Sequence, residues 1–304
     1  MKKLYYSLSE FLKSKFGEKV KKIPIDAGLT CPTRDGTKGF GGCIYCDPKG
    51  SGTGLFKKGL SVEQQVELFL EKFRKRKFKK FIAYFQSFCN TYAPIEVLDK
   101  LYSVVYKDPS IVGLAIGTRP DCIDEDVIKL LKKYQSQGYF LWIELGLQSI
   151  HNKTLELINR GHTFEDFLKA YYMLKENDIP VVVHIIFGLP EENKEMMLAT
   201  VKKLAELKID GIKFHALYIV KGSKMEKLYK KGKYKPLELD FYVNLVAESL
   251  CYLPPTTVIH RLTSEARPEE IVAPLWVSKK HEVVNLIRKT MEEKGFYQGK
   301  FYKN

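Results

Sequence analysis

The chain has 304 residues, of which 45% are hydrophobic and 28% are charged. That composition is ordinary for a globular protein with a buried core, and it excludes a disordered or low-complexity chain. No run approaches the ~18 consecutive apolar residues of a membrane-spanning helix. The start of the chain is amphipathic and interrupted by polar residues, unlike a signal peptide. We therefore expect a cytoplasmic protein without membrane contact.

The charge is unbalanced, because 50 Lys and Arg residues stand against 36 Asp and Glu residues, a formal net charge of +14. A surplus of this size favours an anionic partner, and nucleic acid is the commonest one. Similar surfaces also occur for solubility alone and in heat-adapted proteins. The basic runs Lys19–Lys22, Arg74–Lys80 and Lys221–Lys235 therefore support a nucleic-acid partner without establishing it.

Short apolar segments alternate with longer amphipathic ones along most of the chain. Strands are predicted where Ile, Val, Phe and Tyr cluster between Gly, Pro or Asp, at Ile23–Ala27, Phe81–Phe85, Val112–Gly117, Phe140–Leu147, Val181–Phe187 and Gly211–Leu217. Helices are predicted where apolar residues recur every three or four positions, at Val62–Arg74, Ile95–Lys107, Asp124–Gln135, Asn152–Ile158, Phe164–Asn177 and Lys194–Leu207. Thr163, which is followed by acidic residues, is the expected start of one helix.

Six strand–helix units in sequence predict a parallel sheet. Because the crossovers of such a sheet share one hand, we expect an α/β protein with a partial (β/α)6 TIM-like barrel. An open doubly wound sheet is the alternative, although no Gly-x-Gly-x-x-Gly follows the first strand. In both architectures the chemistry belongs at the carboxyl ends of the strands.

The pattern changes at about residue 236. Two helices, a break and a strand are expected there, at Leu239–Leu250, Lys280–Lys294, Pro254-Pro255 and Thr256–Leu262. The predicted domains are therefore a core barrel with its N-terminal lead-in, residues 1–235, and an α/β extension that packs on the barrel, residues 236–304.

Three of the six cysteines, Cys31, Cys43 and Cys46, follow the first predicted strand in a Gly-rich loop. In a reducing cytosol such clustering suggests metal binding before disulfides. Soft thiolates select Fe–S clusters, zinc or Cu(I). Structural zinc needs four ligands, whereas three cysteines on a [4Fe–4S] cluster leave one iron open. The alternative is a zinc site completed by Cys89 or a histidine.

A family resemblance starts at these cysteines. The Cys-x-x-Cys pair with Tyr45 before its second Cys resembles the end of the radical S-adenosylmethionine (SAM) motif. Eleven residues separate Cys31 from Cys43, and this longer spacing resembles the YtqA/YhcC subgroup of radical SAM proteins. The same resemblance covers nearly the whole chain, through Lys22–Thr30, Arg34-Asp35-Gly36-Thr37, His260-Arg261-Leu262-Thr263 and Ala273-Pro274-Leu275-Trp276.

The resemblance implies a barrel of the radical SAM type and a [4Fe–4S] cluster held by Cys31, Cys43 and Cys46. The open iron would chelate the amino and carboxylate groups of SAM, and one-electron reduction would cleave SAM to a 5′-deoxyadenosyl radical. A reductant such as flavodoxin or ferredoxin would supply the electron. The protein binds and shields these cofactors, which carry the chemistry. Tyr45 would lie against the adenine, with a packed aromatic as the alternative.

The loops after the second and third strands offer candidates for SAM binding. Gln86, Ser87 and Asn90 stand where many radical SAM enzymes have a Gly-Gly-Glu-like turn, and this chain lacks those glycines. After the third strand, Arg119 is a candidate for a carboxylate, and Asp121 for a ribose or an amine. The alternative is a turn that only ends the strand.

Further candidates follow the fourth and fifth strands. Gln148 and Arg160 resemble radical SAM residues that bind the ribose and the methionine carboxylate, and Arg suits a carboxylate. His184 could bind ribose or substrate, or be a core histidine, as could His215. Glu144 could face the sulfonium of SAM or be a satisfied buried carboxylate.

The resemblance also reaches elongator-type radical SAM proteins, and it implies tRNA as partner. The implied reaction converts a carboxymethylaminomethyl group at C5 of the wobble uridine into aminomethyl. The net charge of +14 fits this partner. His260, Arg261 and Arg267 are candidate substrate residues, since a substrate carboxylate calls for Arg; their alternative is packing of the extension.

Two other functions stay open. A radical SAM enzyme that acts on a metabolite or a protein would cleave SAM without RNA affinity. A non-enzymatic nucleic-acid-binding module would hold a structural zinc at the three cysteines, and its metal content would distinguish it.

Overall fold

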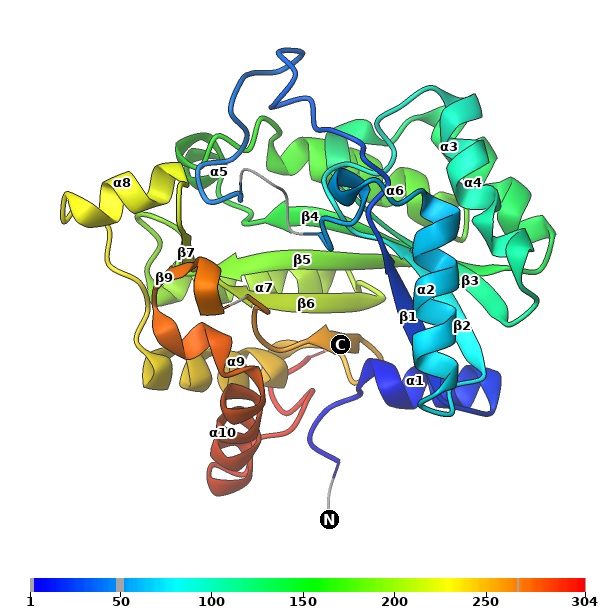
Figure 1. Ribbon diagram of the computed structural model, residues 1–304. Helices are drawn as coiled ribbons and strands as arrows, with labels where there is room; N and C mark the ends of the chain where they lie inside the picture. The colour runs from blue at the N-terminus through cyan, green and yellow to red at the C-terminus, as the bar shows by residue number, and fades with distance from the viewer. Residues whose placement is uncertain (1–2, 48–51, 267, 304) are drawn as a thin grey trace.

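A parallel sheet forms the centre of the protein. The computed structural model describes residues 3–47, 52–266 and 268–303. Seven strands pair side by side in the order β1-β2-β3-β4-β5-β6-β8, all in parallel (Figure 1). Their bounds are β1 Val20–Ile25, β2 Lys80–Phe85, β3 Ile111–Thr118, β4 Phe140–Gln148, β5 Val181–Phe187, β6 Gly211–Ala216 and β8 Val258–Arg261.

The order of the strands in the sheet follows their order in the chain, without a reversal. A doubly wound sheet reverses its order at a switch point, so the alternative architecture does not occur here. The sheet instead curls in one direction, and the expected α/β partial barrel is confirmed. A seventh strand, β8, is contributed by the C-terminal region and pairs with β6.

Helices connect successive strands and cover the outer face of the sheet (Figure 1). They are α2 Val62–Arg74, α3 Ile95–Tyr102, α4 Glu125–Ser136, α5 Asn152–Leu157, α6 Phe164–Glu176 and α7 Lys194–Glu206. Thr163 is the N-cap of α6 and accepts from the backbone N–H of Asp166, so the expected start is confirmed. The predicted helix at 95–107 ends as α-helix at Tyr102 and continues as a 3-10 helix, η2 Ser103–Lys107.

Alternate residues of each strand face the helices and the lumen of the barrel. On β2, Phe85 packs in the core beneath the helices, whereas Tyr84 faces the lumen. Tyr84 belongs there to an apolar cluster with Trp142 of β4 and Leu12 of α1, a helix at Leu8–Phe16. The N-terminal helix therefore packs against lumen-facing side chains.

The C-terminal region packs on the barrel and extends its sheet. Helices α9 (Leu239–Tyr252) and α10 (Lys280–Glu293) lie against each other and flank β8. Strands β7 (Ile219–Val220) and β9 (Ile271–Ala273) form a short antiparallel pair. Helix α8 (Lys224–Lys230) follows β7 in the chain. Single-turn 3-10 helices occur at η1 Phe56–Lys58, η3 Pro120–Cys122, η4 Pro268–Glu270 and η5 Leu275–Ser278.

The domain division at residues 235 and 236 stays a prediction, and β8 shows that residues from both sides of it share one sheet. In the described part of the chain, no helix combines the length and apolar character needed to cross a bilayer. Arg267 lies outside the described residues.

Candidate active site

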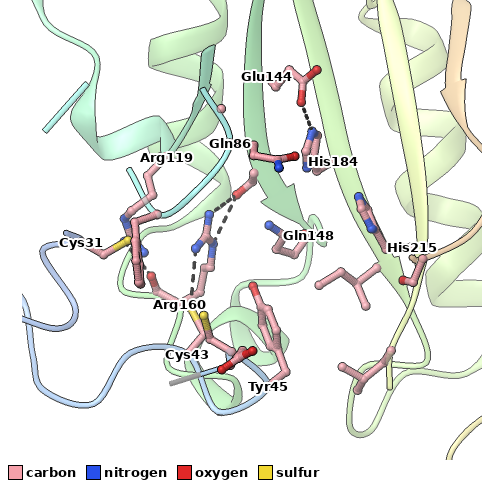
Figure 2. Close-up of a pocket in the computed structure, with 18 of the residues that line it drawn as sticks. Cys31, Cys43, Tyr45, Gln86, Arg119, Glu144, Gln148, Arg160, His184 and His215 are labelled. Carbon is pink, nitrogen blue, oxygen red and sulfur yellow. Dashed lines mark hydrogen bonds and ion pairs between the residues drawn. The ribbon is translucent and has the colours of Figure 1, made fainter. Parts of the chain in front are cut away.

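A cavity of about 340 Å³ lies at the carboxyl ends of the strands. The loop after β1 and the ends of β2, β3, β4, β5, β6 and β8 contribute its walls. Figure 2 shows Cys31, Cys43 and Tyr45 at one end, Glu144 and His184 at the other, and Gln148 and Arg160 between them. This is the end of the sheet at which the sequence predicts the chemistry.

All three predicted cluster cysteines line this cavity. Each thiol of the Cys-x-x-Cys pair has a guanidinium donor: Nη1 of Arg160 lies 3.5 Å from Sγ of Cys43, and Nη2 of Arg34 lies 3.1 Å from Sγ of Cys46. Burial opposes ionisation of Cys43, but Arg160 acts through charge and hydrogen bonding to lower the pKa of the thiol. Charge-assisted donors of this kind stabilise thiolates, the form that binds metal.

Among the residues that the structure describes, no three His, Cys, Asp or Glu side chains gather closely enough to hold a single metal ion. Cys89, the proposed fourth zinc ligand, is fully buried, and its Sγ lies 3.0 Å from the hydroxyl of Thr118. Three thiols around one cavity, with cationic donors beside them, fit a polynuclear cluster better than a closed tetrahedral zinc site.

The turn after α5 binds the cysteine loop. The backbone N–H of Ile44 donates to the carbonyl of Ile158 at 3.0 Å, and Nδ2 of Asn159 donates to the carbonyl of Gly42 at 2.8 Å. Asn159 adopts a left-handed conformation with φ of 53°. These contacts hold Arg160, the next residue, beside Cys43.

Arg160 is buried and bridges the cysteine loop and the end of β4. Its Nη2 and Nε donate to the carbonyl of Gly146 at 2.7 and 3.3 Å. Gly146 leaves room for this contact, because a Cβ there would lie 2.5 Å from Nη2 of Arg160 and 2.7 Å from Nε2 of Gln148. Gln148 itself ends β4 with φ of 77° and lines the cavity. The predicted pair Gln148 and Arg160 thus occupies one wall.

Arg119 and Asp121 pair with each other. Nε and Nη2 of Arg119 donate to the two carboxylate oxygens of Asp121 at 2.9 and 3.0 Å, and Lys38 lies 2.9 Å from the same carboxylate. Arg119 also donates to the carbonyl of Arg160 at 2.7 Å. The carboxylate that Arg119 meets here is therefore internal, although its buried Nη1 has no hydrogen-bond partner in the described chain. Their roles toward SAM stay predictions.

The three SAM-binding candidates in the loop after β2 do not all reach the cavity. Gln86 lines the cavity. Ser87 and Asn90 are buried outside its walls, and Nδ2 of Asn90 donates to the carbonyl of Gly117 at 2.8 Å. The Oγ of Ser87 and Oδ1 of Asn90 have no hydrogen-bond partner among the described residues. Tyr45 lines the cavity and packs on an apolar cluster.

A buried ionic network centred on Glu144 lies at the opposite end of the cavity. Its Oε2 accepts from the hydroxyl of Tyr84 at 2.8 Å and from Lys213, and its Oε1 accepts from the indole of Trp142 at 3.0 Å. Nζ of Lys22 lies 3.8 Å from Oε1. Burial disfavours the charged carboxylate, but Lys213 and Lys22 together hold the pKa of Glu144 well below its usual range. Glu144 is thus a satisfied buried carboxylate that also borders the cavity.

His184 lies on the cavity side of this network. Its Nε2 is 2.9 Å from Oε2 of Glu144. Burial first, and then the charge of Lys213, lower the pKa of His184 to about 4, so the imidazole is neutral near neutral pH. If Nε2–H donates to Glu144, Nδ1 keeps its lone pair.

Of the remaining predicted residues, one lies below the cavity and two line its wall. His260 is packed below the cavity, edge-on to Trp142 with ring centroids 5.5 Å apart. Arg261 lines the cavity, and its Nη2 is 3.4 Å from Glu265. His215 also lines it, with a buried Nε2 that has no partner in the described chain.

Arg34, Tyr84 and Lys213 are among the residues in and around the site that were not predicted. Arg34 lies in the quoted Arg-Asp-Gly-Thr motif, but the sequence does not reveal that it reaches Cys46. Tyr84 and Lys213 are lumen-facing positions of β2 and β6. A period-two pattern signals Lys213, since Lys213 and His215 are polar residues at alternate positions of an otherwise apolar strand.

Comparison with known proteins assigns the family. The Radical SAM superfamily profile matches residues 37–204, and the Radical_SAM C-terminal domain profile matches residues 209–293. The chain is 41% identical over 301 residues to the uncharacterized protein YtqA of Bacillus subtilis, covering 99% of this chain and 93% of that protein. It is 37% identical over 276 residues to protein YhcC of Escherichia coli, covering 91% and 88%. The protein therefore belongs to the radical SAM superfamily, within a YtqA/YhcC-like subgroup.

Elongator-related proteins are more distant. The chain is 30% identical over 188 residues to the tRNA uridine(34) acetyltransferase of Methanocaldococcus jannaschii, covering 60% of this chain and 33% of that protein. The structure of an N-terminally truncated Elp3 from Methanocaldococcus infernus superposes with a TM-score of 0.70 at 20% identity, covering 92% of this chain and 64% of that one. The second match shows a shared fold. As in the rest of the superfamily, the cofactors are a [4Fe–4S] cluster and SAM.

Proposed function

We propose that this radical SAM enzyme modifies tRNA at the wobble uridine, converting a carboxymethylaminomethyl group at C5 into aminomethyl. The partial similarity to tRNA uridine(34) acetyltransferases and the net charge of +14 support an RNA substrate. A flavodoxin or ferredoxin would serve as the one-electron reductant.

Cys31, Cys43 and Cys46 would hold the cluster. The residues that would surround SAM are Tyr45, Gln86, Arg119, Gln148, Arg160 and His184, which line the cavity, and Ser87, Asn90 and Asp121 behind its walls. Arg160 is the best placed to meet the SAM carboxylate, because it combines a buried cationic fork with contact to Cys43. When bound, the cluster and SAM would supply a 5′-deoxyadenosyl radical able to take a hydrogen atom from the substrate.

The observation that carries the proposal is the composition of the wall formed by β5, β6 and β8. Opposite the thiols, this wall presents His184, His215 and Arg261. The substituent on the uridine joins a secondary amine to a carboxylate through one CH₂ group. Nδ1 of neutral His184 can accept from the amine, and Arg261 can pair with the carboxylate, since its present contact with Glu265 is long at 3.4 Å.

This arrangement holds the substrate CH₂ between its two polar neighbours. Loss of a hydrogen atom from that carbon would leave an α-amino radical, and transfer of one further electron back to the flavodoxin or ferredoxin would give an imine. Water would then hydrolyse the imine, releasing the carboxymethyl group as glyoxylate and leaving the aminomethyl amine on the uridine. His215 adds an unpartnered Nε2 for a further polar atom of the substrate. His260, below the floor, would act through Trp142 on the shape of the wall rather than by touching RNA.

The test uses anaerobically reconstituted protein with SAM, a reductant and tRNA that carries the carboxymethylaminomethyl group. Digestion and mass spectrometry of nucleosides should show aminomethyluridine appearing together with 5′-deoxyadenosine. The triple Cys31→Ala, Cys43→Ala, Cys46→Ala variant is the control and should form neither. Abundant 5′-deoxyadenosine with an unchanged nucleoside profile would reject this reaction and favour a metabolite or protein substrate.

A further inference from the structure

A basic segment, residues 221–235, projects from the molecule beside the cavity. It contains seven lysines and one glutamate, with no other charged side chain. All seven lysines are exposed, at Lys221, Lys224, Lys227, Lys230, Lys231, Lys233 and Lys235. Helix α8 forms its central part and stands out from the edge of the molecule (Figure 1). We call this segment the lysine arm.

The lysine arm begins directly after residues that line the cavity. Tyr218 and Val220 line the cavity, and Lys221 is the next residue of the chain. The backbone N–H of Met225 donates to the carbonyl of Ile44 at 3.1 Å, between two of the predicted cluster cysteines. Met225 is fully buried in an apolar cluster that includes Ile44 and Tyr45. The root of the arm is therefore fixed to the cysteine loop, while its charged side chains face solvent.

Most of the positive charge on the arm is not neutralised by the protein. Lys230 pairs with Glu226 at 2.7 Å and Lys235 with Glu238 at 3.3 Å. Across the described residues, the other five lysines of the arm have no carboxylate within ion-pair distance. The acid inside the arm is also used locally, because Glu226 accepts from the backbone N–H of Gly222 at 2.7 Å.

Exposed aromatic rings accompany these charges. Tyr229 of α8 is 37% exposed and Phe40 of the cysteine loop is 76% exposed. Lys224 leans onto that loop, since a Cβ at Gly41 would lie 3.1 Å from its Nζ. Cationic side chains interleaved with accessible rings form a surface typical of contact with a nucleic-acid backbone and unstacked bases.

We propose that the lysine arm is the docking surface for the phosphate backbone of the RNA substrate, a role that rests on the proposed function. When the base of a nucleotide enters the cavity, the phosphates on either side of that nucleotide must lie over the residues around the cavity mouth. On the β7 side of the cavity these residues are the lysine arm. Lysines without internal partners gain most from this contact, because phosphate replaces only small counterions.

The test compares two triple variants with the same charge change in the reconstituted holoprotein. Lys227→Gln, Lys231→Gln, Lys233→Gln removes unpaired charge from the arm. Lys72→Gln, Lys77→Gln, Lys79→Gln removes exposed charge from the last turn of α2 and the segment that follows it, next to the amino end of β2. Fluorescence anisotropy with tRNA, at several salt concentrations, gives the dissociation constant and its salt slope. The arm variant should bind about tenfold more weakly, and its salt slope should fall by up to about three, one for each lysine removed. The matched variant should bind as the wild type does.

The possible outcomes distinguish failure of the docking surface from failure of the proposed function. Equal tRNA affinity of both variants, whether unchanged or equally weakened, overturns the lysine arm as the docking surface and leaves the proposed function standing. Absence of tRNA binding by the wild type overturns the proposed function and the arm with it. An arm variant that binds tRNA normally, but whose cluster is reduced more slowly by flavodoxin, overturns the proposal in favour of an acidic protein donor. Production of 5′-deoxyadenosine without RNA, at the wild-type rate, confirms that the arm variant is folded.

Discussion

The guanidinium of Arg160 lies 3.5 Å from the thiol of Cys43 and donates two further hydrogen bonds to the carbonyl of Gly146. One side chain thus connects the cysteine loop to the end of β4. The connection requires a planar fork with several N–H groups, and lysine cannot reproduce it.

Arg160→Lys should therefore weaken SAM binding by about tenfold or more, because it keeps the charge and loses charge-assisted hydrogen bonds. Equilibrium dialysis with the reconstituted protein measures the affinity. Arg288→Lys on exposed α10 is the control and should bind SAM normally. Wild-type affinity in the Arg160→Lys variant would show that the fork does not contact SAM.

Cys89 should be dispensable for the metal centre. Its thiol is fully buried beside Thr118, outside the walls of the cavity. Cys89→Ala should keep iron and sulfide content and visible absorbance near wild-type levels, whereas Cys43→Ala should lose most of both. A Cys89→Ala variant that loses its metal, or a wild type that retains zinc in place of iron, would instead support the hypothesis of a four-ligand zinc site.

Glu144 should be important for stability because it is the acceptor for a buried lysine. Glu144→Leu leaves Lys213 without its carboxylate and should lower the free energy of unfolding by about 3–5 kcal/mol. The double variant Glu144→Leu, Lys213→Met removes both charges and should recover much of that loss. Urea unfolding of the three proteins gives the comparison. A double variant as unstable as the single one would mean that the cost comes from packing rather than from the unpaired charge.

Stability should fall on mild acidification, partly through His184. Burial lowers its pKa to about 4 in the folded protein, whereas an unfolded histidine has a pKa of about 6.5. Between these values the unfolded chain holds a proton that the folded protein lacks. The stabilisation is complete above about pH 6.5 and is lost toward pH 4, by up to about 1.4 kcal/mol per pH unit.

His184→Gln tests this contribution and keeps a donor for Glu144. Between pH 7 and pH 5, the wild type should lose about 2 kcal/mol more than the variant in urea unfolding. The groups that face His184 are Glu144 from β4, Lys213 and His215 from β6, and Arg261 from β8. Of these, His215 also has a lowered pKa, first through burial, which the variant keeps, and then through the charge of His184, which the variant removes. Identical pH dependence of the two proteins would show that folding does not change the pKa of His184.

The strands and helices of the barrel follow from the sequence because each is long enough for its apolar period to stand out. Helix α1 was not predicted, although Ser7, Glu10 and Gly17 form its capping box and left-handed C-cap. Helix α8 is short and rich in lysine, so its apolar positions, Met225 among them, form no visible repeat. Both helices depend on tertiary burial of a few side chains rather than on periodicity.

The three cysteines and Arg160 were predicted from residue type and motif, and all four line one cavity, while their roles stay predictions. The site was less predictable where partners decide the outcome. Arg119 meets Asp121 two residues away, and no sequence rule distinguishes that internal pair from a pair with a ligand. Asn90 follows a strand end like Gln86, but its side chain turns to the carbonyl of Gly117 instead of the cavity. These outcomes depend on backbone directions in loops.

Residue 146 has practical value for separating the steps of turnover. A single methyl group there would meet Nη2 of Arg160 and Nε2 of Gln148 at once, and a displaced Arg160 would also change its contact with Cys43. We therefore expect Gly146→Ala to weaken SAM binding, and under the proposed function a variant that keeps its cluster, expressed in cells, would still bind its RNA substrate without modifying it. The RNA that copurifies with the variant would then identify the substrate of the active enzyme.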